Sequence, residues 1–220
     1  MDLYKIFSLL LGMPKTLYIN FKYFKIKDAI KLPIIVSHKT YLKNVKGSIK
    51  INSKIKPFMV KIGFGDVAIF DRHKSRTIFS NTGNIIFNGT AYIGHGSKLS
   101  VAGCLILGDN FCISAQTSII CNKKVSFGDN CLLSWENLIM DTDFHKIKNC
   151  KNDIINNDKN IEISNNVWIG CRCTVLKGTF INENTVVAAN SCIANKFHSK
   201  NVIIGSNPAK IIKENITWEI

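Results

Sequence analysis

Aliphatic or aromatic side chains recur at every sixth position over long stretches of the chain. Between residues 163 and 193 these positions are all aliphatic: Ile163, Ile169, Val175, Ile181, Val187 and Ile193. The same step recurs upstream in three triplets: Phe87, Ile93 and Leu99; Leu107, Ile113 and Ile119; Phe127, Leu133 and Ile139. The phase slips by two residues between successive triplets. The positions between are rich in small, polar and turn-forming residues.

A six-residue period matches neither an α-helix nor an alternating strand of that length. It matches a short flat strand followed by a corner, with one apolar side chain per strand facing inward. Corners need a positive φ, which Gly and Asn tolerate, and Gly108-Asp109-Asn110 and Gly128-Asp129-Asn130 mark equivalent corners. Three such strands make a triangular coil of about 18 residues, and stacked coils bury a continuous core. The pattern therefore predicts an all-β fold, a parallel β-helix, over residues 85–213.

The repeat stops after Ile139 and resumes at Ile161. Residues 141–160, rich in Asn, Asp and Lys, are therefore predicted to form a loop extruded from the coil, with His145 near its base. Residues 1–84 are predicted to form an N-terminal cap and the first irregular coils, and residues 214–220 a C-terminal tail. Irregular segments on rigid scaffolds often carry function, so the loop is a candidate for the active site.

The first 30 residues form a basic amphipathic segment, with lysines interleaved among aromatic residues between positions 21 and 27. Its first apolar residues share one side: Leu3, Ile6, Phe7, Leu10 and Leu11. The stretch lacks the basic residues and cleavage site of a signal peptide, so a retained helix is predicted. This helix is expected to cap the open end of the coil stack, as solenoids require. Contact with an anionic membrane is a second, compatible interpretation.

The chain of 220 residues carries 29 Lys and Arg against 15 Asp and Glu, a net charge of +14. This charge predicts an anionic partner or surface. Nucleic acid is not expected, because the lysines are scattered and no nucleic-acid motif is present. No apolar run approaches the length of a transmembrane helix.

The eight cysteines include no Cys-x-x-Cys pair, and the nearest two are Cys171 and Cys173. We interpret them as reduced, small, buried side chains of a cytoplasmic protein rather than as disulfides or a zinc site. No metal is predicted.

Three C-terminal segments resemble the hexapeptide-repeat acyltransferases: Asn166-Val167-Trp168-Ile169-Gly170, Val186-Val187-Ala188-Ala189-Asn190-Ser191, and the run Gly205 to Lys213 around Asn207-Pro208-Ala209. Residues 139–145, ending in Asp143-Phe144-His145, resemble the catalytic-histidine segment of the bacterial O-acetyltransferases that modify envelope polysaccharides. The resemblance implies that the β-helix is left-handed and that the protein forms a homotrimer.

The resemblance also implies the site residues. His145 is expected to act as general base, with Asp143 or a loop carbonyl orienting its ring. The donor implied is acetyl-CoA. Its thioester is expected beside Trp168, Gly170 and Cys171, its pantetheine arm beside Ala189, Asn190 and Ala194, and its phosphates beside Lys196, Lys210 and Lys213. In the family this donor site lies between subunits, so His145 of one chain is expected to work with Trp168 of its neighbour.

The activity expected is transfer of an acetyl group from acetyl-CoA to a sugar hydroxyl, in the assembly of capsule, lipopolysaccharide or a related glycan. Two alternatives stay open on the sequence. One is N-acyl transfer to an amino sugar. The other is a non-catalytic β-solenoid that binds glycans as a scaffold.

Overall fold

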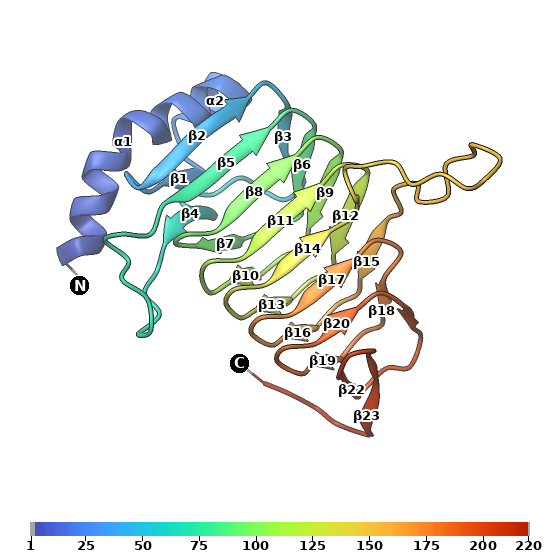
Figure 1. Cartoon of the computed structure of the whole chain (residues 1–220). Helices are drawn as coiled ribbons and strands as arrows, with labels where there is room; N and C mark the ends of the chain where they lie inside the picture. The colour runs from blue at the N-terminus through green and yellow to red at the C-terminus, as the bar shows by residue number, and fades with distance from the viewer. Residues whose placement is uncertain (1–2, 220) are drawn as a thin grey trace.

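Three parallel sheets wrap around one core in the computed structural model, which describes residues 3–219 (Figure 1). Sheet A contains β1 (Ile34–Val36), β4 (Val60–Phe64), β7 (Ala91–Gly94), β10 (Phe111–Ile113), β13 (Leu132–Leu133), β16 (Trp168–Ile169), β19 (Val186–Val187), β22 (Val202–Gly205) and the antiparallel β23 (Lys210–Glu214). Sheet B contains β2 (Thr40–Val45), β5 (Thr77–Asn81), β8 (Lys98–Val101), β11 (Ser118–Cys121), β14 (Leu138–Met140), β17 (Thr174–Leu176) and β20 (Cys192–Ile193). Sheet C contains β3 (Ser48–Ile51), β6 (Asn84–Phe87), β9 (Cys104–Leu107), β12 (Lys124–Phe127), β15 (Ile161–Ile163), β18 (Phe180–Ile181) and β21 (Lys196–Phe197). The chain visits the sheets in the order A, B, C, so each round is one coil of the predicted β-helix.

The six-residue period of apolar side chains is the register of this β-helix. On sheet A the paired residues are Ile93, Ile113, Leu133, Ile169 and Val187, and all five are fully buried. Each strand thus contributes an inward side chain that stacks on its counterpart in the next coil. This stacking removes apolar surface from water along the whole length of the molecule, which is the main stabilising contribution.

The two-residue phase slips have a structural cause at the corner between sheets B and C. From β5 to the loop, successive coils are 20 residues long, because that corner holds two extra residues, such as Asn122 and Lys123. From β15 to β20, after the loop, the coils have the predicted 18 residues. Glycine is required where the long corners stack: a Cβ on Gly103 would lie only 2.3 Å from the carbonyl oxygen of Lys123.

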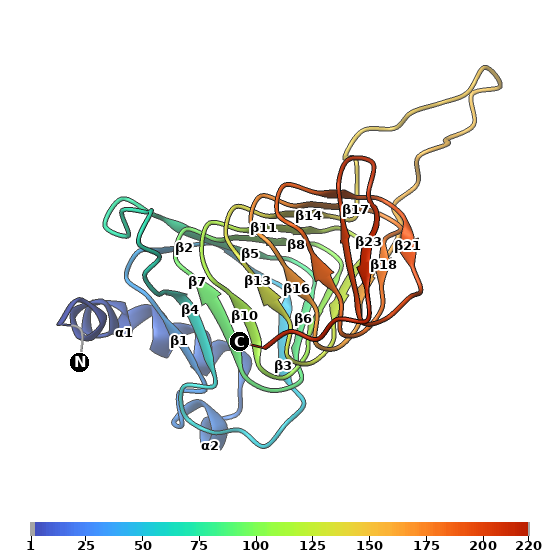
Figure 2. The ribbon, with the colours of Figure 1, turned by 90° about the horizontal axis from the view of Figure 1, so that it is seen from below.

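Residues 141–160 form the predicted loop, which leaves the coil between β14 and β15. Figure 2 shows that this loop and the N-terminal helix project from opposite sides of the molecule. The β-helix itself begins at Ile34, and its first coils carry register shifts, one of them between Leu42 and Asn44.

Two helices precede the coils, α1 (Leu3–Tyr23) and α2 (Ile26–Ala29). Helix α1 caps the open edge of sheet A with its polar side. The Asn20 side chain donates to the Ile34 carbonyl at 2.6 Å and accepts from the Ile34 N–H at 3.1 Å, and Thr16 Oγ1 accepts from the Val36 N–H at 3.0 Å. Gly12 permits the close approach, since a Cβ there would lie 2.1 Å from the Val36 carbonyl oxygen. The side chains of α1 therefore supply the partners that a next strand would supply.

None of the eight cysteines is in a disulfide. Within residues 3–219, no helix combines the length and the apolar character needed to cross a membrane.

Candidate functional site

The base of the loop is anchored by a buried carboxylate, Asp141. Its two oxygens accept hydrogen bonds from the backbone N–H groups of Asn122 and Lys123 at 2.7 and 2.8 Å. These donors belong to the corner of the preceding coil. Through these two hydrogen bonds, the Asp141 side chain ties the start of the loop to the rigid stack of coils.

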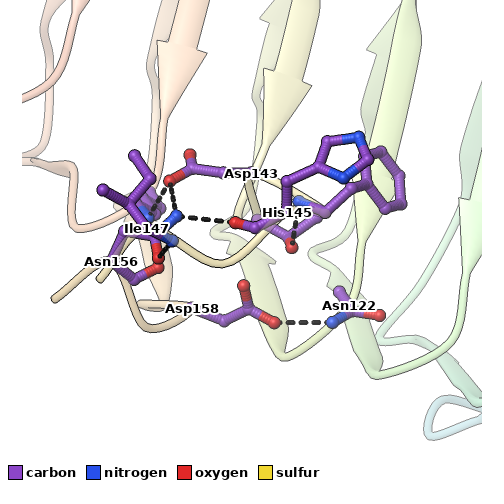
Figure 3. Close-up of polar contacts among 9 residues, drawn as sticks. Asn122, Asp143, His145, Ile147, Asn156 and Asp158 are labelled. Carbon is purple, nitrogen blue, oxygen red and sulfur yellow. Dashed lines mark hydrogen bonds and ion pairs between the residues drawn. The ribbon is translucent and has the colours of Figure 1, made fainter. Parts of the chain in front are cut away.

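Asn156 and Lys177 hold the segment that carries His145 (Figure 3). Asn156 Nδ2 donates to Asp143 Oδ2 and to the His145 carbonyl oxygen, both at 2.8 Å. Lys177 Nζ donates to the same Asp143 oxygen and, at 2.7 Å, to the Asn156 carbonyl oxygen. The hydrogen bonds from Lys177 and Asn156 hold the pKa of the Asp143 carboxyl below its usual value. Asp143 is therefore an ionised bridge between the two sides of the loop.

The His145 side chain is exposed, and its ring makes no hydrogen bond to any residue within 3–219. Figure 3 shows the Asp143 carboxylate turned toward Asn156 and the imidazole turned the other way. In this arrangement Asp143 orients the His145 backbone, through Asn156, rather than the His145 ring.

A cavity of about 350 Å³ opens beside His145, a volume in the range of small-ligand sites. Its lining residues are Asn122, Thr142, Phe144, His145, Lys146, Ile154, Asn156, Asn157 and Asp158. Asp158 Oδ2 accepts from Asn122 Nδ2 at 2.5 Å, and hydrogen bonds from Thr142 and Asn122 hold the pKa of the Asp158 carboxyl below its usual value. An ionised carboxylate, several amides and an aromatic ring suit a ligand that carries many hydroxyl groups, such as a sugar.

A second group of expected residues lies at the corner between sheets A and B, where two coils stack closely. The Gly170 N–H donates to the Val187 carbonyl at 2.9 Å, and the Asn190 N–H donates to the Cys171 carbonyl at 2.9 Å. A Cβ on Gly170 would lie 2.8 Å from the backbone nitrogen of Ala189, so only glycine fits this contact. Gly170 and Cys171 of one coil thus stack directly on Ala189 and Asn190 of the next, and Trp168 lies two residues before Gly170.

Trp168 stands at the edge of this corner and is 37% exposed. Its indole N–H donates to Ser134 Oγ at 3.1 Å, and its ring lies 6.0 Å from that of Trp218. Trp218 in turn donates its indole N–H to the Asn166 carbonyl at 2.9 Å. The C-terminal tail therefore folds back on the site, a contact that sequence analysis missed. The signal in the sequence was a tryptophan in a tail that also contains isoleucine at positions 216 and 220.

The other residues expected to bind acetyl-CoA lie away from the corner between sheets A and B. Ala194 follows β20 at the corner between sheets B and C, and Lys196 begins β21 in sheet C. Lys196 lines a separate cavity of about 350 Å³ with Lys123, Lys159 and His198 among its neighbours. Lys210 and Lys213 are exposed on β23.

A single chain does not bring His145 and Trp168 to the same corner. His145 follows β14 of sheet B, whereas Trp168 lies in sheet A and Cys171 at the corner after it. The strands of sheet B therefore lie between the corner that carries His145 and the corner that carries Trp168 and Cys171. Among residues 3–219, no three His, Cys, Asp or Glu side chains are grouped to hold a metal ion.

No family model matches the chain. It is 30% identical over 191 residues to an uncharacterised 24.8 kDa protein in the cps region of Klebsiella pneumoniae, covering 86% of this chain and 82% of that protein. It is 41% identical over 106 residues to the polysialic acid O-acetyltransferase of Neisseria meningitidis, covering 48% of this chain and 49% of that enzyme. The chain belongs to the hexapeptide-repeat acetyltransferase family.

Membership in this family makes the protein an enzyme and confirms the expected left-handed parallel β-helix. The fold is shared with the crystal structure of the polySia-specific acetyltransferase NeuO, at a TM-score of 0.57 and 20% identity, over 84% of this chain and 90% of that one. The 41% identical match spans only about half of the Neisseria enzyme.

Proposed function

We propose that the protein transfers an acetyl group from acetyl-CoA to a hydroxyl of a bacterial surface glycan, with His145 as general base. The observation that carries the proposal is the cavity at the loop base, where the free imidazole of His145 lies among hydroxyl-binding groups. The kinship with a protein of a cps region and with a polysialic acid O-acetyltransferase supports a surface glycan as acceptor.

The chemistry follows from an imidazole whose ring is available. His145 removes the proton from the acceptor hydroxyl as its oxygen attacks the thioester carbonyl carbon. The tetrahedral oxyanion is stabilised by a hydrogen bond from the backbone N–H of Cys171. The Cys171 side chain contributes little, because a thiol is a poor hydrogen-bond donor. The C–S bond then breaks, and the CoA thiolate takes the proton from the imidazolium. The products are the acetyl ester and free CoA.

We propose that the active site is completed by a neighbouring subunit of a homotrimer. The separation of His145 from Trp168 and Cys171 by sheet B supports this arrangement, because one chain supplies the base and its neighbour the thioester surface. Ala189, Asn190 and Ala194 are proposed to line the pantetheine arm. Lys196, Lys210 and Lys213 are proposed to meet the phosphates as point charges. Since acetyl-CoA is a cytoplasmic metabolite, this function places the protein in the cytoplasm.

Ligand-dependent thermal unfolding tests the donor assignment. Acetyl-CoA at about 100 times its dissociation constant should stabilise the protein by about 2.7 kcal/mol. The same shift is expected for wild type and for His145→Ala, because His145 takes part in chemistry rather than in donor binding. No shift in a well-folded protein would refute the acetyl-CoA proposal and would favour the glycan-binding scaffold.

Acetyl transfer to candidate glycans tests the base. His145→Ala should lower kcat by about 100-fold or more, while His73→Ala, which changes an exposed histidine between β4 and β5, serves as the matched control. Equal activity of His145→Ala and His73→Ala would refute the role of His145. The product distinguishes the remaining alternative, because an ester is cleaved by mild base whereas the amide of an N-acylated amino sugar survives.

A further inference from the structure

Helix α1 presents a row of large apolar side chains to solvent. We name this row the apolar stripe, and its members, each between 41% and 82% exposed, are Leu3, Phe7, Leu10, Leu11, Leu17, Tyr18 and Phe21. At 3.6 residues per turn these positions fall within an arc of about 120° on one side of the helix. Single exposed apolar residues are common on protein surfaces, but a contiguous row of seven indicates an interaction site.

The exposure of the apolar stripe follows from how α1 caps the β-helix. The opposite side of the helix carries Ser8, Gly12, Thr16 and Asn20, all buried against the edge of sheet A. Turning the apolar stripe inward would remove the hydrogen bonds that Asn20 and Thr16 make to the edge strand. Buried backbone groups without partners are strongly destabilising. The fold therefore holds the apolar stripe outward.

Positive charge is concentrated in the same region. Residues 1–61 contain 13 lysines and two aspartates, so they carry 13 − 2 = +11 of the net charge of +14. Lys22, Lys25 and Lys27 directly follow the apolar stripe and are all exposed. Lys22 lies in the last turn of α1, whereas Lys25 and Lys27 come after the helix ends at Tyr23. An apolar helix side with cations at its end is typical of a segment that lies in a membrane interface.

We propose that α1 and the lysines that follow it bind the surface of an anionic lipid bilayer, with the helix parallel to the membrane plane. The apolar stripe enters the headgroup and upper acyl region, while Lys22, Lys25 and Lys27 meet anionic headgroups. A second copy of this chain is a poorer partner, since it would bring two strongly basic surfaces together. The proposal goes beyond acetyl transfer and does not depend on it.

Vesicle flotation of the full chain tests the proposal. The protein should float with vesicles of mixed phosphatidylcholine and phosphatidylglycerol and stay behind with phosphatidylcholine alone. Leu10→Ser should weaken binding by about 10-fold, because a leucine no longer enters the bilayer. Ile69→Ser is the matched control: Ile69 is 62% exposed and Leu10 63%, but Ile69 lies outside α1, and its replacement should leave binding unchanged.

The charge is tested separately from the apolar contact. The double variant Lys22→Gln with Lys25→Gln should lower binding to the anionic vesicles by about 25-fold, at about fivefold per lysine. The control pair Lys98→Gln with Lys151→Gln should leave it unchanged. Absent binding, or equal binding to neutral vesicles, would overturn the proposal. So would a Leu10→Ser variant whose mass in solution, measured by sedimentation without lipid, is lower than that of wild type, because the apolar stripe would then join copies of the chain.

Discussion

Mixing two inactive variants tests whether the active site is shared between subunits. His145→Ala removes the proposed base, and Trp168→Ala removes the aromatic side chain beside the proposed thioester position. The two residues lie at different corners of the β-helix, with sheet B between them. If each site takes one corner from each of two neighbours, a chain with either defect still supplies the other half of a working site.

The expected recovery follows from the ring geometry of a trimer. Each interface pairs the His145 side of one chain with the Trp168 side of the next, in a fixed direction around the ring. In any trimer that contains both variants, one of the three interfaces joins the two intact halves, whichever variant is in excess. Such mixed trimers should therefore show about one third of wild-type kcat, while each pure variant stays nearly inactive.

Co-expression with two different affinity tags, followed by purification on both, isolates the mixed trimers for an acetyl-transfer assay. Two differently tagged copies of His145→Ala provide the control, which should remain inactive. Activity of the mixed trimers no higher than that of the pure variants would refute the shared site. It would mean that one chain supplies both corners after all, or that the subunits assemble differently.

Three further predictions follow from the contacts. Lys177→Met removes the ion pair that holds the Asp143 carboxylate, so the loop that carries His145 is misplaced. The kcat should fall about 10-fold to 100-fold, while the KM for acetyl-CoA stays constant. A constant kcat would contradict this positioning role. Gly103→Ala places a methyl group 2.3 Å from the Lys123 carbonyl oxygen and should destabilise the fold by about 1–3 kcal/mol in urea unfolding, and an unchanged midpoint would count against the close coil contact. Burial lowers the pKa of His95, which is 3% exposed, below its ordinary value of 6.5. The folded state therefore favours the neutral imidazole, and this contribution to stability is present above about pH 6.5 and is lost as the pH falls below that value. The stability of His95→Gln should decline less than that of wild type between about pH 7 and pH 5, and parallel declines would refute the assignment.

The β-helix was predictable from the sequence because its repeat is local. Each strand places one side chain inward, so a period of six residues appears directly in the order of amino acids. The interruption between Ile139 and Ile161 located the loop in the same way. Even the two-residue phase slips were visible, although only the structure showed that they arise at the corner between sheets B and C.

The environment of His145 was not predictable, because its partners are distant in the chain. Lys177 lies 34 residues from Asp143, and nothing in a single sequence pairs them. Trp218 meets Trp168 only because the C-terminal tail folds back along sheet A. Side-chain direction was also beyond the sequence: Asp143 was a candidate for orienting the imidazole, whereas the structure places its carboxylate on Lys177 and Asn156.

The N-terminal helix shows most clearly which features follow from the sequence and which follow from the tertiary structure. The sequence by itself determined that Leu3, Phe7, Leu10 and Leu11 share one side of a helix, because that follows from the period of the helix alone. Which side faces the protein was decided by the tertiary structure. Without α1, the edge strand of sheet A would leave N–H and C=O groups unpaired, and the polar side of α1 supplies hydrogen bonds to them.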